Sequence, residues 1–76
     1  MNKVRRNEIR SIIDSLNEIK TQLDSVAFDE QFAFDNLSEG LQCSMRGEKI
    51  EECAETLSEA VDSLDDIISN LEDAIV

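Results

Sequence analysis

Carboxylates are the only side chains abundant enough in this sequence to suggest chemistry. The chain has 18 acidic residues and no histidine or tyrosine, so no nucleophile can be paired with a plausible base. Glu48, Glu51, Glu52 and Glu55 follow the i, i+3, i+4 spacing of one helix face, which suggests a carboxylate metal site. However, the Glu-x-x-His element of di-iron bundles and the Asp-x-Asp-x-Asp-Gly loop of calcium sites are both missing. We therefore predict a solvated acidic face, with no enzymatic activity and no catalytic, cofactor or metal site.

The two cysteines do not change this prediction. Cys43 and Cys53 are ten residues apart, a separation that fits no zinc motif. We expect two reduced thiols in a cytoplasmic protein, with Cys53 filling space in the core.

The charge of the chain restricts its partners. A net charge of −11 on 76 residues repels nucleic acids and anionic membranes, so the expected counterpart is a basic protein surface. The sequence has no run of eighteen apolar residues, and because its arginine-rich start leads into an amphipathic segment we expect no signal peptide. The charge is uneven: residues 1–20 sum to +2, residues 21–44 to −5 and residues 45–76 to −8. These sums predict a rod with one basic tip.

Three apolar rows with heptad spacing organise the second half of the chain. Their alternating spacings of three and four predict a helix over residues 45–75. A stripe three positions wide in seven favours a helical bundle over a two-stranded coiled coil. The rows are Ile50, Leu57, Leu64 and Leu71; Cys53, Ala60, Ile67 and Ala74; and Ala54, Val61, Ile68 and Ile75.

A second heptad pattern predicts a helix over residues 2–34. Basic residues near its start and acidic residues near residue 73 are each at the wrong end for a helix dipole, but they become complementary if the helices pair antiparallel. We predict an all-α antiparallel hairpin in a single domain, residues 1–76, that dimerises into a four-helix bundle because one copy has a thin core. The heptad pattern of the first helix extends to Val26, and the predicted core and oligomer residues are Ile9, Ile12, Leu16, Ile19, Leu23, Leu57, Val61, Leu64, Ile68 and Leu71.

The connection between the helices contains all three aromatic residues. Helical spacing places Phe34 near the inner face but Phe28 and Phe32 roughly opposite it. Either the helix bends or a segment folds back over this pair, or the pair is an exposed patch that docks a partner. Asn36 is predicted to cap a short helical turn through Gln42, and Ser44 to cap the second long helix.

Residues 34–48, FDNLSEGLQCSMRGE, followed by the acidic heptads, resemble small acidic helical proteins carried by bacteriophages and prophages of Gram-positive bacteria. The resemblance covers most of the chain, although only the DNL-EGLQ-S-RGE pattern is distinctive, and a proline common in those proteins is replaced here by Ser38. It implies no activity. It implies a phage setting inside a bacterial host, where short acidic proteins often bind and inhibit host proteins.

The outer face of the second helix has three interpretations. It could serve solubility alone, mimic a nucleic-acid backbone, or form a specific docking site. Its carboxylates have a spacing of roughly 4 Å along the helix, comparable to phosphates on one DNA strand. The predicted function is binding and modulation of a basic host protein by a homodimer; the alternative is a purely structural oligomerisation module. The predicted partner-binding residues are Glu51, Glu52, Glu55, Glu59, Asp62, Asp65 and Asp66, with Phe28 and Phe32 as an aromatic patch.

Overall fold

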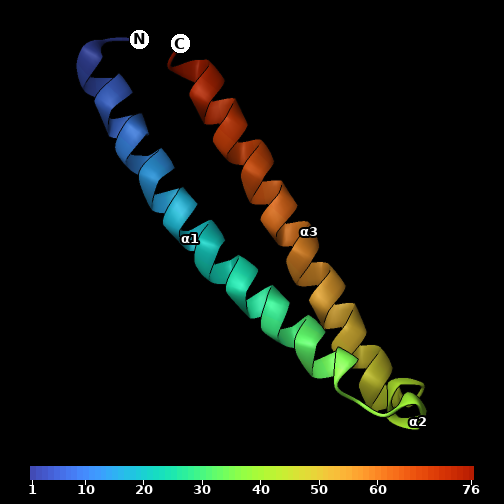
Figure 1. Cartoon of the computed structure of the whole chain (residues 1–76). Helices are drawn as coiled ribbons and strands as arrows, with labels where there is room; N and C mark the ends of the chain where they lie inside the picture. The colour runs from blue at the N-terminus through green and yellow to red at the C-terminus, as the bar shows by residue number, and fades with distance from the viewer.

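The computed structural model describes residues 1–76 and contains only helices. Helix α1 (Lys3–Asp35) and helix α3 (Met45–Ala74) lie side by side and antiparallel, and the short helix α2 (Glu39–Gln42) sits in the bend (Figure 1). Both termini therefore lie at the same end of a rod whose Cα extents are 58 × 15 × 13 Å. The prediction of an all-α hairpin with two long helices is confirmed.

Side-chain caps define where the helices begin. The Asn2 carboxamide oxygen accepts a hydrogen bond from the Arg5 amide at 2.8 Å, and the Ser44 hydroxyl accepts one from the Gly47 amide at 3.1 Å. The predicted Ser44 cap is confirmed, and Asn2 caps α1 in the same way. The predicted role of Asn36 is wrong, because Asn36 ends α1, donating its side-chain amide to the Phe32 carbonyl, while Ser38 caps α2. Each cap satisfies a backbone amide that has no partner inside its own helix.

The two long helices meet along one seam with alternating spacings of three and four residues. In α1 every residue outside the seam is exposed, and in α3 only Ala60 adds to it. Two rows per helix therefore face the other helix, the arrangement expected for a pair of packed helices. The seam consists of Arg6, Ile9, Ile13, Leu16, Lys20, Leu23, Ala27, Glu30 and Phe34 in α1 and of Gly47, Ile50, Ala54, Leu57, Val61, Leu64, Ile68 and Leu71 in α3, with Ile75 just beyond it.

The third apolar row of each helix lies outside this seam. Ile12, Ile19 and Ile67 remain 52, 50 and 46% exposed, and Val26 is 50% exposed. Within one chain the buried stripe is thus two positions wide, where three were predicted. The prediction that Cys53 fills the core is wrong for the same reason, since both cysteines are free and exposed. A single partner helix covers only about two rows, so the third apolar row stays partly exposed in the single chain.

A close backbone contact at Gly47 holds the bend together. A Cβ atom at Gly47 would lie 2.6 Å from the Gln42 carbonyl oxygen and 2.8 Å from the Gln42 Cα, and closer still to the Leu41 carbonyl oxygen. Helix α2 can approach the first turn of α3 only because this residue has no side chain. The Gln42 side-chain amide also donates to the Phe34 carbonyl at 3.2 Å, which ties α2 to the end of α1.

Candidate interaction surfaces

The acidic residues predicted to bind a partner are all exposed on α3 and form a continuous acidic face. We use this name for the set Glu51, Glu52, Glu55, Glu59, Asp62, Asp65 and Asp66. Only Asp65 is in an ion pair, with the Lys20 ammonium 2.6 Å from its carboxylate. The other six carboxylates have no cation within ion-pair distance in the chain, so their charge is available to a partner.

Lys20 is a seam residue that the heptad pattern missed. It lies at a half-buried position of α1, between Leu16 and Leu23, and reaches across to Asp65 on α3. The hydrogen bond to the Asp65 carboxylate raises the pKa of Lys20 above its ordinary value of 10.5, aided by the negative charges of Asp65 and Asp24. The missed signal was Ile13: counting the seam through Ile13 instead of Ile12 places Lys20 on the seam one heptad later.

The predicted aromatic patch is exposed. Phe28 and Phe32 are 69 and 59% exposed, and their rings lie near-parallel, with centroids 6.4 Å apart and an interplanar angle of 16°. No segment folds back over them, so the first of the two predicted explanations is wrong. Asp24, Asp29 and Asp35 lie within one helical turn of the pair, which gives the aromatic surface an acidic border.

The aromatic pair and part of the acidic face share one side of the hairpin. Phe28, Glu48 and Glu55 each directly follow a buried residue of the seam: Ala27, Gly47 and Ala54. These three buried residues occupy equivalent positions of the seam, which lie toward the same side of two antiparallel helices. The residue after each of them is turned about 100° further around its helix, toward that same side of the hairpin. The Lys20–Asp65 ion pair also crosses the hairpin on this side.

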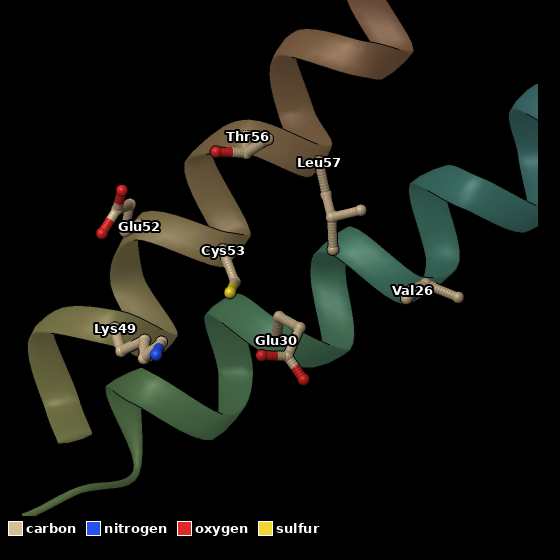
Figure 2. Close-up of a pocket in the computed structure, with 7 residues that line it drawn as sticks. All are labelled: Val26, Glu30, Lys49, Glu52, Cys53, Thr56 and Leu57. Atoms are coloured by element: carbon tan, nitrogen blue, oxygen red, sulfur yellow. The ribbon is translucent and has the colours of Figure 1, made fainter.

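The opposite side carries the exposed third row of both helices, which we call the apolar flank. Each member directly precedes a seam residue. A groove of about 580 Å³ lies between the helices. Val26 and Glu30 line it from α1, and Cys53 and Leu57, among others, line it from α3 (Figure 2). Because Val26 and Cys53 line one groove, the two rows form one surface. The apolar flank comprises Ile12, Ile19, Val26 and Ala33 in α1 and Cys53, Ala60, Ile67 and Ala74 in α3.

Charge is absent from the middle of the apolar flank and from its polar border. The border residues, one turn from the flank residues, are Ser15, Gln22, Thr56, Ser63 and Asn70. Between residues 12 and 26 and between 53 and 74, none of the twelve residues on the flank or this border is charged, although a third of the chain is charged and about four would be expected. On the opposite side, six of the ten residues next to the seam over the same spans are acidic. The hairpin thus has one side suited to apolar contact and one suited to a cationic surface.

The basic residues at the start of α1 do not pair with α3. The prediction of complementary charges between this end and Glu72 or Asp73 is wrong at the level of direct contact, since Lys20–Asp65 is the one ion pair of the chain. None of the helices combines the length and the apolar character that a membrane crossing requires. The chain matches no protein-family model, and neither the curated proteins nor the solved structures yielded a match.

Proposed function

We propose that this protein acts by binding, and that its acidic face and the Phe28–Phe32 pair together engage a basic surface of another protein. The observation that carries the proposal is that unpaired carboxylates, including those of Glu55 and Asp62, and a stacked aromatic pair lie on one side of the hairpin. A surface built only for solubility would not need two exposed phenylalanines beside its carboxylates.

The chemistry of this side fits a partner rich in arginine or lysine. Exposed aromatic faces attract cations, by about 0.5–1 kcal/mol at exposed sites, and guanidinium groups bind carboxylates through two parallel hydrogen bonds. Aromatic residues also contribute a large share of the energy of many protein interfaces. The resemblance of residues 34–48 to phage proteins makes a protein of the bacterial host the proposed partner, and the cytoplasm the proposed location. Mimicry of a nucleic-acid backbone is one form this binding would take.

The proposal is tested by capturing partners from a bacterial lysate at low salt with the wild-type chain and two variants. Neutralising Glu55, Asp62 and Asp66 to Gln or Asn should lower binding of a captured basic protein at least tenfold, because three charge contacts are lost. Phe28→Ala with Phe32→Ala should do the same without loss of helix content, since both rings are exposed. Competition by duplex DNA would support mimicry. Capture that is unaffected by both variants would overturn the proposal.

A second candidate function, an oligomerisation module, is favoured by the apolar flank. We propose that the chain forms a homodimer and that two hairpins make a four-helix bundle, the usual way to cover a wide apolar stripe. The two functions are compatible because the apolar flank and the acidic face overlap only at Glu52, which lines the groove of the flank.

A further inference from the structure

The surface of the single chain is larger than a compact protein of its mass has. A folded monomer of 8.6 kDa exposes about 4,700 Å², whereas this chain exposes 5732 Å². The excess, about 1,000 Å², is close to the roughly 800 Å² that each partner contributes to a standard protein interface. One side of the rod, 58 Å by 15 Å in Cα extent, has a projected area of roughly 870 Å². The apolar flank is therefore the right size for one stable interface.

From these observations, and resting on the proposed homodimer, we infer that a second copy of the chain docks flank to flank with its bend at the opposite end of the rod. The charges favour this orientation. The half of the hairpin nearest the bend, residues 20–63, has three basic and eleven acidic side chains, a charge of −8, whereas the half with the termini has four basic and seven acidic ones, a charge of −3. Copies with both bends at one end would place −8 beside −8. The opposite orientation places −8 beside −3 and reduces this repulsion.

The groove in Figure 2 supports the same orientation. It lies near the bend and carries the carboxylates of Glu30 and Glu52 and the ammonium of Lys49 beside its apolar residues, a net charge of −1. In the inferred dimer the end of the partner that carries the termini faces this groove. The row of the flank continues there from Ile12 to the exposed cation Arg5, with the carboxylate of Glu8 beside it, so that these two charges cancel. With both bends at one end, each groove would instead face the other groove and place two net negative charges together.

The side chains of the flank also complement themselves in this orientation. A two-fold axis at the level of Ile19 places each α1 across its own copy, with Ile12 facing Val26 of the partner subunit. On α3 the same axis places Ala60 across the larger Ile67 of the partner subunit, and Cys53 across Ala74 of the partner subunit. The one large residue of this row, Ile67, thus faces a small one, as interdigitated helix packing requires.

The dimer is tested by light scattering and by one substitution on the flank. The wild-type chain should have twice the 8.6 kDa monomer mass at micromolar concentrations, and its dissociation constant should fall as salt is added, because two chains of −11 repel each other. Ile19→Asp should raise the dissociation constant at least ~100-fold, because each copy would bury a charge. The matched control Ser25→Asp, an exposed position of α1 off the flank, should leave the dimer intact. A monomeric mass for wild type at every concentration up to high micromolar would overturn the inference.

The orientation is tested by a crosslink between native Cys53 and a cysteine placed at Ala74. The two positions are 21 residues apart on one helix, about 31 Å, so they cannot bond within a chain. In a Cys43→Ser background, Ala74→Cys should give a covalent dimer on oxidation with copper phenanthroline. The control Asp73→Cys, on the outer side of α3, should give much less. A dimeric mass without the Ala74→Cys crosslink would overturn the orientation while leaving the oligomerisation module standing, and partner capture by the acidic face is a separate measurement that neither result changes.

Discussion

Replacing Gly47 by alanine should destabilise the hairpin at its bend. Gly47 is buried in the first turn of α3, and an added Cβ would meet the backbone of α2, 2.6 Å from the Gln42 carbonyl oxygen and 2.8 Å from the Gln42 Cα. Ordinary van der Waals contact begins at about 3.4 Å, so α2 would have to move by several tenths of an ångström or more. Backbone atoms cannot rotate away as a flexible side chain does.

The magnitude follows from two opposing effects. Overpacking of this kind costs typically about 1–3 kcal/mol. Replacing glycine by alanine inside a helix recovers roughly 0.5–1 kcal/mol. The net loss in the free energy of unfolding is therefore between about 0 and 2.5 kcal/mol, with a middle value of about 1 kcal/mol. For a chain of this length each kcal/mol lowers the Tm by roughly 4–8 °C, so the expected fall in Tm is about 4–8 °C.

Gly40 provides a matched control in the same bend. No atom lies within 4 Å of a Cβ placed there, and the residue is exposed in α2. Gly40→Ala should leave the Tm unchanged or raise it slightly. Both variants are measured by thermal and urea unfolding followed by far-UV circular dichroism, at one fixed protein concentration because dimerisation shifts the Tm. A Tm for Gly47→Ala equal to or above that of Gly40→Ala would refute the close contact between α2 and α3.

Two further predictions concern the cap of α3 and the one ion pair. Ser44→Ala should lower the free energy of unfolding by about 1 kcal/mol, because the Ser44 hydroxyl accepts a hydrogen bond from the Gly47 amide and donates one to the Leu41 carbonyl. Urea unfolding measures this loss, and a loss no larger than that of Ser25→Ala at an exposed position would contradict the prediction. The raised pKa of Lys20 means that its contribution to stability is fully present below pH 10.5 and is lost as the pH rises through the pKa of the folded state. In the Lys20→Met variant the Tm should therefore fall less above pH 10.5 than in the wild type. Its Tm at pH 7 should be unchanged or higher, because a half-buried seam position favours an apolar side chain. The control is Lys3→Met, and an equal fall of Tm at alkaline pH in the wild type and Lys20→Met would count against this explanation.

The helices and their caps could be predicted from the sequence because the signals are local. Heptad spacing of apolar residues requires a helix whatever surrounds it, and Asn2 and Ser44 cap by reaching an amide three residues ahead. The exposure of Phe28 and Phe32 could be anticipated as one of two alternatives, since helical spacing places both residues roughly opposite the inner face of the helix. The carboxylates of the acidic face lie outward because no apolar environment would accept them.

The sequence by itself determined that two amphipathic helices form, that one is acidic along its outside and that they pair antiparallel. It could not determine which two of three apolar rows face inward, because Ile12 and Ile13, like Cys53 and Ala54, are nearly equivalent in hydrophobicity. Only the tertiary structure decided this. In the packed hairpin each helix is rotated about its axis so that Ile13 and Ala54 face inward, Lys20 reaches Asp65, and Ile12, Ile19 and Ile67 remain together on an uncovered flank.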